Sequence, residues 1–219
     1  MIFFENIKKK KATLIKLYPE AIIIDVTSKS LDQYVKLSPF YPHGEIPVPF
    51  SENVFSYSVE GIWQGLKVFN NEGIDTSRFL NKTMSNLKRT IKMFGLPLGH
   101  SKGVDGDDLL DYVSARKLIY VPSYYWMLEH KAKDEIDQLI QIAISNDLVL
   151  LDFDTNSDIE NPKKPLSHAS LIKTYIELKH PELVEKRFHF PKNVKNSKKK
   201  KSMNETSKIA NADQLTLNF

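Results

Sequence analysis

The sequence predicts an α+β fold in which helices predominate and the sheet is small, formed as one domain over residues 1–190. Three observations predict this fold. The 219 residues are 41% hydrophobic and 26% charged, values typical of a globular chain large enough to bury a core. Apolar residues recur at helical spacing along most of the chain, whereas only two segments read as buried strands. No internal repeat is visible.

The first quarter of the chain predicts a helix, a strand and a long loop. Lysines alternate with apolar residues at helical spacing over residues 5–18, and the β-branched run Ala21–Val26 predicts a buried strand. Residues 37–50 contain four prolines, which exclude helix and central strand. We therefore expect residues 27–55 to form a loop of fixed shape with short extended pieces.

Helical patterns dominate the rest of the chain. A helix is expected over Val59–Asn70, with Gly73 just beyond its end as a stop, and another over Thr76–Met93. The further elements expected are a glycine-rich loop (95–106), helices (107–117 and 124–146), a strand (148–153), a polar loop (154–165), and a helix (167–178) that closes the core near Phe190.

Composition excludes several classes of protein. The chain has no cysteine, which excludes disulfides, thiolate chemistry and cysteine-bound metal, and fits a reducing cytosol. Apolar residues precede the basic run Lys8–Lys11, the reverse of a signal peptide, and no apolar run approaches membrane-spanning length. The six histidines lack paired metal-ligand spacing. We expect a cytoplasmic protein with no metal, no cofactor and no membrane partner.

One polar row in apolar surroundings is the strongest candidate for a site. In a helix starting at Ser58, the side chains of Glu60, Gln64 and Lys67 fall within about 40° of one another. Val59, Ile62, Trp63 and Leu66 surround them. A carboxylate, an amide and an amine placed in this way indicate a site. The alternative is an ordinary exposed helix face with an i,i+4 pair.

This row and the proline-rich loop together resemble the signature of the NADAR (YbiA-like) family. The matching residues are Ser38-Pro-Phe40-Tyr41-Pro, a spacer of about 15 residues, and Ser58-x-Glu60-x3-Gln64-x2-Lys67. The match covers residues 34–69. The resemblance implies a single NADAR-like domain that cleaves N-glycosidic bonds, including those of ribosylated pyrimidine intermediates and of ADP-ribose attached to guanine.

The resemblance also implies roles for individual residues. Glu60 matches the catalytic glutamate, which would stabilise oxocarbenium character at C1′ or activate the nucleophile. Lys67 either attacks C1′ to give a Schiff base or pairs with Glu60 or a phosphate. Gln64 would orient Glu60 or hydrogen-bond the base edge. Phe40 and Tyr41 match the family's aromatic loop and would stack on a base, the alternative being a packing role.

Three further residues are weaker candidates. Ser38 opens the aromatic loop and is assigned to substrate binding with it. Asp154 or Asp158 would supply a second carboxylate, because the family's late Asp-x-x-Trp-Gly loop corresponds to residues 152–158, here without Trp-Gly. The alternative is an ordinary polar turn. The family's Arg-x-Asp-Trp segment has no clean match.

The glycine-rich loop is a candidate phosphate cradle through His100 and Lys102, although it lacks the P-loop spacing. The alternative is a mobile lid or a plain connection.

The C-terminal residues differ in character from the domain. Residues 191–212 are rich in Lys, Asn and Ser, which predicts a disordered basic linker. The last seven residues, 213–219, resemble the peptide by which proteins bind the bacterial sliding clamp. The resemblance implies clamp contacts by Gln214, Leu215, Leu217 and Phe219. The alternatives are a random tail and a last strand docked on the core. Lys198–Lys201 would add salt-dependent attraction to DNA.

Three functions follow from these observations. The first is an N-glycosidase acting on DNA, which removes ADP-ribose from guanine as antitoxins of DNA-modifying toxins do, or excises a modified base as a DNA glycosylase. The second is an N-glycosidase acting on a free nucleotide. The third is a non-catalytic clamp-binding adaptor, against which the intact Glu60, Gln64 and Lys67 argue.

Overall fold

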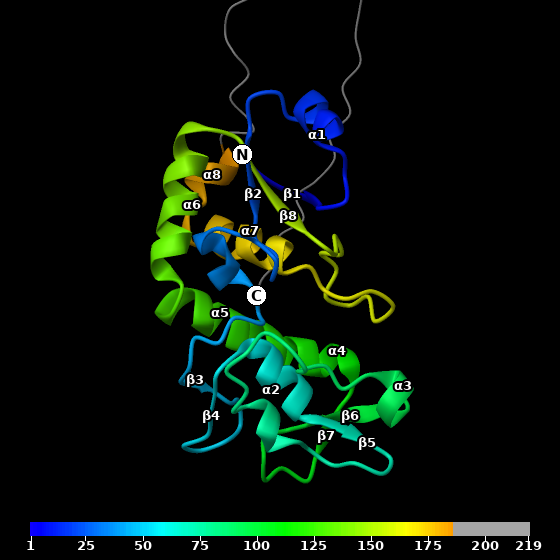
Figure 1. Ribbon diagram of the computed structural model, residues 1–219. Helices are drawn as coiled ribbons and strands as arrows, with labels where there is room; N and C mark the ends of the chain where they lie inside the picture. The colour runs from blue at the N-terminus through cyan, green and yellow to red at the C-terminus, as the bar shows by residue number, and fades with distance from the viewer. Residues whose placement is uncertain (186–219) are drawn as a thin grey trace, which may run out of the picture. The chain divides into compact units, whose positions relative to one another are not determined.

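Apolar segments far apart in the sequence form a three-stranded parallel sheet in a computed structural model, which describes residues 1–185 (Figure 1). Strand β8 (Leu148–Asp152) lies between β1 (Ile2–Asn6) and β2 (Ile22–Asp25), and Leu148 is opposite both Ile2 and Ile22. Its first three residues are fully buried, as expected of a central parallel strand covered on its faces.

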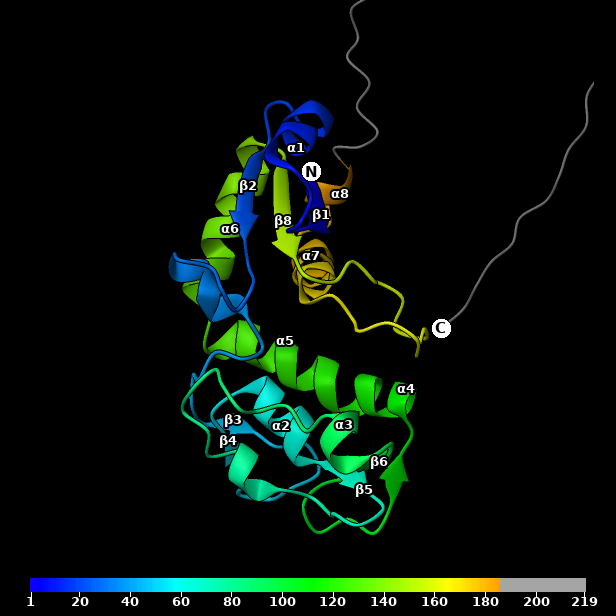
Figure 2. The same ribbon diagram turned by 45° about the vertical axis from the view of Figure 1, so that its right-hand side comes forward.

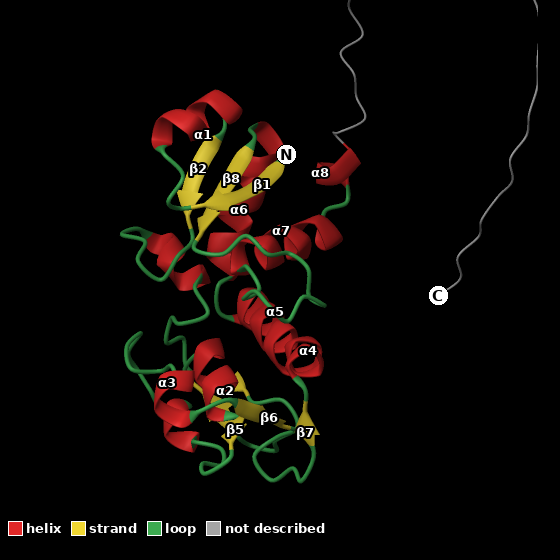
Figure 3. Cartoon of the chain, turned by 90° about the vertical axis from the view of Figure 1, so that its right-hand side faces the viewer, coloured by secondary structure: helices red, strands yellow, loops and turns green. Residues whose placement is uncertain are grey.

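The chain divides into two units, residues 1–188 and residues 189–219, and the described residues all belong to the first. Helices and short strands complete this first unit around the parallel sheet. Helices α6 (Lys133–Ser145) and α7 (His168–Lys179) pack on the parallel sheet, and α1 (Lys11–Leu17) connects β1 to β2 (Figure 3). The remaining short elements are β3 (Ile46–Pro47), β4 (Phe55–Ser56), α2 (Val59–Gly65), β5 (Lys67–Phe69), α3 (Ile91–Phe94), β6 (Pro97–Ser101), β7 (Leu109–Leu110) and α8 (Glu182–Glu185), with 3₁₀ turns η1 (Gln33–Leu37) and η2 (Thr76–Arg78). The fold is therefore α+β with helix predominating, as predicted.

A continuous helical rod separates the parallel sheet from the short strands (Figure 2). It consists of α4 (Tyr112–Ala115), the π-helical turn η3 (Arg116–Tyr120) and α5 (Val121–His130). A π-helical turn inserts one extra residue into a helix and is frequent at functional sites. No helix among the described residues is both long and apolar enough to cross a membrane.

Helix α2 is buried among the short strands on the side of the helical rod away from the parallel sheet (Figure 2). The hydroxyl of Ser58 accepts a hydrogen bond from the Gly61 amide (3.0 Å) and caps the helix, and all seven helical residues are buried. Gly61 and Gly65 allow this burial because other side chains approach the helix closely at both positions. A Cβ at Gly65 would lie 2.8 Å from Cδ1 of Phe79, a contact that no real Cβ tolerates.

This close approach predicts a large effect of Gly65→Ala on stability. We expect the free energy of unfolding to fall by about 1–3 kcal/mol, because the buried Phe79 ring must move. Gly73→Ala is the matched control, since nothing lies within 4 Å of a Cβ there and a change below about 0.5 kcal/mol is expected. Urea denaturation of both variants measures the difference. Equal losses would show that the Phe79 contact is not the cause.

The prediction for the start of the chain is wrong in part. A helix is expected over residues 5–18, but residues 5 and 6 end strand β1 and helix α1 begins at Lys11. Every residue of β1 pairs with one of β8. This long-range pairing outweighs the local helical pattern, which is why the sequence predicts two strands and misses β1.

The helix expected over residues 59–70 is shorter than predicted. It ends at Gly65, and Lys67–Phe69 form strand β5, which pairs with β6. Gly73 is therefore not the helix stop. Two glycines within seven residues lower the helix propensity, so the antiparallel pairing with β6 prevails beyond Leu66.

The helix expected over residues 76–93 is absent apart from η2 and the start of α3. Asn86 has a φ of 58°, a left-handed conformation that interrupts a right-handed helix. The side chain of Asn81 accepts a hydrogen bond from the Thr83 amide (2.7 Å). Such local side-chain bonds replace the helical ones.

The middle of the chain also differs from prediction. The glycine-rich loop contains strand β6, β7 occupies part of the helix expected over 107–117, and the helix expected over 124–146 is divided between α5 and α6 at residues 131 and 132. Near the C-terminal end, β8, the polar loop after it and α7 confirm the expected strand, loop and helix to within two residues.

Candidate functional site

A cavity of about 460 Å³ opens between the proline-rich loop, helix α2, the helical rod and the end of strand β8. Its lining is a mixture of charged and aromatic side chains. The polar row predicted from the sequence lies in it, together with side chains from several other segments. The lining residues used below are Ser38, Phe40, Glu60, Trp63, Gln64, Lys67, Lys88, Arg89, Tyr112, Arg116, Tyr120, Asp152, Asp154 and His168.

Glu60, Gln64 and Lys67 form one hydrogen-bonded row, although Lys67 belongs to a strand. Lys67 Nζ donates to Gln64 Oε1 (2.9 Å), and Gln64 Nε2 donates to Glu60 Oε1 (2.8 Å). The amide of Arg89 also donates to Gln64 Oε1 (2.9 Å). Because two donors meet its oxygen, the Gln64 side chain must present its NH₂ group to Glu60. Gln64 therefore fixes the position of the carboxylate.

Burial shifts the acid and the base of this row toward their neutral forms. Glu60 is 6% exposed, and burial raises the pKa of its carboxyl despite the opposing effects of Gln64, Lys67 and Lys88. Burial also lowers the pKa of Lys67, while Glu60 opposes the shift and Arg89 adds to it. A carboxyl and an amine with convergent pKa values can exchange protons with a reacting group.

Aromatic rings form one wall of the cavity. The Trp63 ring lies 5.7 Å from Tyr112 and 5.5 Å from Tyr120, both edge to face. Phe40 lies under the ammonium of Lys88, whose Nζ is 5.4 Å from the ring centroid. Such a wall provides π-faces on which a planar heterocycle can stack. The backbone also joins the two predicted segments, since the Glu60 amide donates to the Pro39 carbonyl (2.8 Å).

His100 does not occupy a phosphate-binding loop. It lies in strand β6, is buried, and packs against Trp63 with ring centroids 3.8 Å apart and the ring planes tilted by 30°. Burial, with Lys67 nearby, lowers the pKa of His100 to about 3, so the ring is neutral at physiological pH. A neutral ring behind Trp63 supports the aromatic wall and offers no charge to an anion.

Several predicted residues lie away from the cavity. The Tyr41 ring packs 4.8 Å from His43, and Lys102 Nζ lies 5.5 Å from the Phe50 ring centroid. The carboxylate of Asp158 accepts a hydrogen bond from the Glu160 amide (2.9 Å) in an exposed turn. None of Tyr41, Lys102 and Asp158 lines the cavity, whereas Ser38 and Phe40 do.

Asp154 is the late-loop carboxylate that reaches the cavity. Burial raises its pKa, and the neighbouring carboxylate of Asp152 raises it further. A raised pKa favours the protonated form, which can donate a proton. Of the two aspartates left open by the sequence, the geometry favours Asp154.

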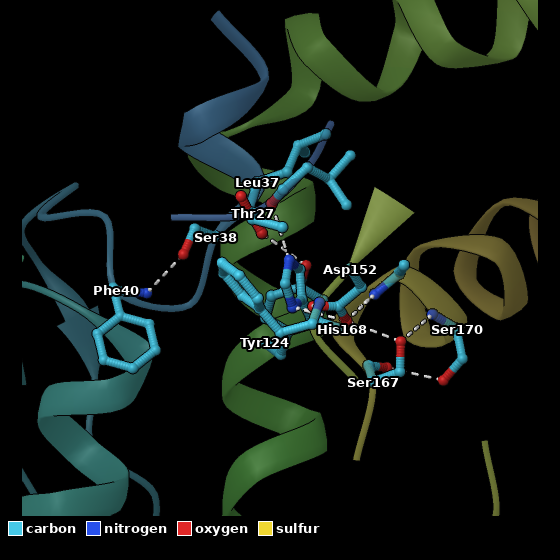
Figure 4. A network of polar contacts seen from close by, with 12 residues as sticks. Thr27, Leu37, Ser38, Phe40, Tyr124, Asp152, Ser167, His168 and Ser170 are labelled. Carbon is cyan, nitrogen blue, oxygen red and sulfur yellow. Dashed lines mark hydrogen bonds and ion pairs between the residues drawn. The ribbon is translucent and has the colours of Figure 1, made fainter. Parts of the chain in front are cut away.

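A buried ion pair in the cavity wall was not predicted. Asp152 Oδ2 lies 3.0 Å from His168 Nδ1 and accepts a hydrogen bond from Ser167 Oγ (2.7 Å), as Figure 4 shows. His168 Nε2 lies 2.8 Å from the Val26 carbonyl. Both ring nitrogens therefore face acceptors, so His168 is an imidazolium. Burial opposes this charge, but Asp152 outweighs it and raises the pKa of His168.

This pair predicts a pH-dependent contribution to stability. The pKa of His168 lies above its ordinary value of 6.5, and His168 lowers the pKa of Asp152 below 3.8 although burial alone would raise it. The pair therefore contributes its full stabilisation at pH values between the two ordinary pKa values, 3.8 for Asp152 and 6.5 for His168. The contribution is lost as the pH rises through the raised pKa of His168, or falls through the lowered pKa of Asp152.

We expect His168→Leu to lower the free energy of unfolding by about 3–5 kcal/mol at about pH 5.5, because it leaves a buried carboxylate unpaired. The loss should be smaller at about pH 9, because the contribution of the pair falls as the pH rises through the raised pKa of His168. Denaturant titrations at both pH values measure this. His180→Leu, which removes a half-buried histidine paired with Glu182, should change stability by at most about 1 kcal/mol. Equal losses at both pH values for His168→Leu would contradict the ion pair.

Arg116 is a second cavity residue that the sequence did not predict. Its buried guanidinium donates to the Asn161 carbonyl (2.6 Å), to the carbonyls of Ile159 and Lys164, and to the Tyr112 hydroxyl (3.1 Å). Arg116 thereby ties the polar loop after β8 to the helical rod. No pattern in the sequence marks it, because its acceptors are backbone carbonyls about 45 residues away.

Two sets of predictions receive no structural description. The linker (191–212) and the residues assigned to clamp binding, Gln214, Leu215, Leu217 and Phe219, lie outside residues 1–185. Within residues 1–185, no group of three or more His, Asp or Glu side chains is arranged to hold a metal ion.

Comparison with known proteins identifies the family but no activity. A search of curated proteins finds no match. The profile of a family of unknown function, DUF6939, matches residues 6–172. The matched region contains β2, β8 and every cavity-lining residue named above, but only the last residue of β1. Because the match covers more than half of the 219 residues, the chain belongs to DUF6939.

Proposed function

We propose that the protein is an N-glycosidase that cleaves a base–sugar or ADP-ribosyl–guanine N-glycosidic bond on DNA. The observation that carries the proposal is the hydrogen-bonded row Glu60–Gln64–Lys67, which faces a cavity with an aromatic wall. These are the residues that carry the resemblance to the NADAR family. The volume of about 460 Å³ suits a nucleoside-sized group.

The proposed reaction breaks the bond between C1′ of the sugar and a ring nitrogen of the base. The bonding electron pair leaves with the nitrogen, which takes a proton from Asp154. Glu60 stabilises the positive charge that develops on the sugar and accepts the proton of the attacking nucleophile. That nucleophile is either water or the Lys67 amine, which would form a Schiff base with the opened sugar before water releases it.

The test is mass spectrometry of the products that the full-length chain releases from defined substrates. These are an oligonucleotide with ADP-ribosylated guanine, oligonucleotides with single modified bases, and the corresponding free nucleotides. We expect release of ADP-ribose or a free base from an oligonucleotide. Release from free nucleotides alone would replace DNA by a small-molecule substrate. No release from any of them would contradict the proposed activity and favour a non-catalytic adaptor.

The predicted clamp peptide makes a separate proposal about location. Short peptides lose conformational entropy on docking, so we expect residues 205–219 to bind a bacterial sliding clamp with micromolar affinity, about −8 kcal/mol. Fluorescence polarisation with a labelled synthetic peptide measures this. The same peptide with Leu215, Leu217 and Phe219 changed to Ala should not bind. Equal binding of both peptides would refute the clamp prediction.

A further inference from the structure

Residues 76–104 form a basic stretch without a single acidic residue. They include six Lys or Arg and no Asp or Glu, although Asp75 and Asp105 flank them. Of the six, only Arg78 forms an ion pair with a residue that the structure describes, Asp75 (2.7 Å). Lys82, Lys88, Lys92 and Lys102 are exposed. Most of this positive charge is thus available to an anionic partner.

Two of these lysines lie over aromatic rings of the proline-rich loop and β4 region. Lys82 Nζ is 5.0 Å from the centroid of the Tyr57 ring, and Lys88 Nζ is 5.4 Å from that of Phe40. Both rings are half-buried. Each pair therefore holds an ammonium over a π-face, and when the ammonium turns to a phosphate that face is free for a base to stack on.

The basic segment leads from Tyr57 to the cavity. At one end, the Tyr57 amide donates to the Phe79 carbonyl (2.8 Å). At the other, the Arg89 amide donates to Gln64 Oε1 (2.9 Å), and Lys88 and Arg89 line the cavity itself. The lysines of both lysine–aromatic pairs therefore belong to one segment, which contacts Tyr57 at one end and Gln64 of the polar row at the other.

Beyond the cavity the same segment exposes apolar side chains. Ile91, which lines the cavity, is 61% exposed, Met93 is 73% exposed, and Lys92 lies between them. Exposed apolar groups next to a lysine place an apolar surface beside a positive charge. They suit the unstacked bases of a single strand, which present apolar faces that a duplex keeps hidden.

We propose that the surface formed by Tyr57, Lys82, Lys88 and Lys92 binds single-stranded DNA on either side of the nucleotide whose base enters the cavity. The proposal rests on the proposed function, because it assumes that the substrate base is part of a DNA strand. The lysines neutralise phosphates, and the Tyr57 ring stacks on a base outside the cavity.

The experiment measures binding of the full-length chain to an unmodified, fluorescein-labelled oligo(dT) of 12 nucleotides by anisotropy, over a range of salt concentrations. Lys82→Gln with Lys92→Gln removes two phosphate contacts without altering the Glu60–Gln64–Lys67 row. Each contact contributes about 0.7 to the slope of log K against log salt for single strands. We expect this variant to bind about 25-fold more weakly at 0.1 M salt, with a slope lower by about 1.4.

The matched control is Lys16→Gln with Lys133→Gln, which removes the same charge from exposed positions on α1 and α6. It should retain wild-type affinity and slope. Tyr57→Leu should weaken binding at least about fivefold with the slope unchanged, because stacking does not release counterions.

Equal losses in the two double variants would show that only net charge matters and would overturn the proposal. Tighter binding of a 12-base-pair duplex, or of oligo(rU) of the same length, would also overturn it by assigning the surface to a different nucleic acid. Because the oligonucleotide carries no adduct, the result does not depend on catalysis. Binding without any product in the mass-spectrometric test would retain this surface and reject the proposed N-glycosidase activity.

Discussion

Changing Glu60 to Gln should reduce kcat for N-glycosidic cleavage by at least about 1,000-fold, because it removes the negative charge that stabilises the oxocarbenium ion. The fold should be retained. Gln at this position keeps the shape of the side chain, and its carbonyl oxygen can accept the hydrogen bond that Gln64 Nε2 gives to Glu60. Single-turnover kinetics on an oligonucleotide substrate, with a thermal melt of the same sample, measure both expectations.

A second buried glutamate provides the matched control. Glu135 is 3% exposed and pairs with Lys36 (2.7 Å), but it does not line the cavity. Glu135→Gln should lower stability while leaving kcat unchanged. A rate for Glu60→Gln close to that of the wild type would remove Glu60 from the reaction and leave Asp154 as the cavity carboxylate to examine.

Replacing Lys67 with Met should abolish covalent trapping of substrate by borohydride, if the Lys67 amine attacks C1′. Met has a similar length and suits a half-buried position, so it removes the amine without leaving a void. The lowered pKa of Lys67, caused by burial, increases the fraction of the amine that is unprotonated and nucleophilic. Mass spectrometry of the reduced protein measures the adduct and its position.

Lys88, the other lysine in the lining of the cavity, is the next candidate nucleophile if trapping survives the change of Lys67. Lys88 lines the cavity, whereas Lys102, an alternative suggested by the glycine-rich loop, does not. Trapping that survives Lys67→Met and disappears in Lys88→Met would move the nucleophile to Lys88. No trapping in the wild-type protein would show that water attacks C1′ directly, and Lys67 would then serve only as a cation beside Glu60.

The candidate site could be predicted where its residues are close in sequence. Glu60 and Gln64 are one helical turn apart, so their spacing alone places the two side chains side by side. Lys67 joins them for a different reason. The chain leaves the helix after Leu66 and enters β5, yet the Lys67 side chain still reaches Gln64 Oε1. The three side chains therefore lie in one row as predicted, although the observed helix ends at Gly65 and does not include Lys67.

The residues that the sequence did not reveal depend on long-range contacts. Asp152 and His168 meet because β8 and α7 pack together, and His168 also needs the Val26 carbonyl, 142 residues away. Arg116 binds carbonyl groups, which every residue possesses, so no residue type marks its partners. The failed helix over 76–93 has a local origin instead, since Asn86 adopts a left-handed conformation and the Asn81 side chain binds the Thr83 amide.

The position of β8 in the parallel sheet sets the order in which the protein can be completed during synthesis. β1 and β2 pair only with β8 and not with each other, so both must wait for residues 148–152. At about 5–20 residues per second, the ribosome needs roughly ten seconds to make the intervening chain. During this time two apolar strands are without their partner. The cavity wall carrying Asp152, Asp154 and His168 is then the last part to form, so an incomplete chain would hold Glu60 and Lys67 without an enclosed site.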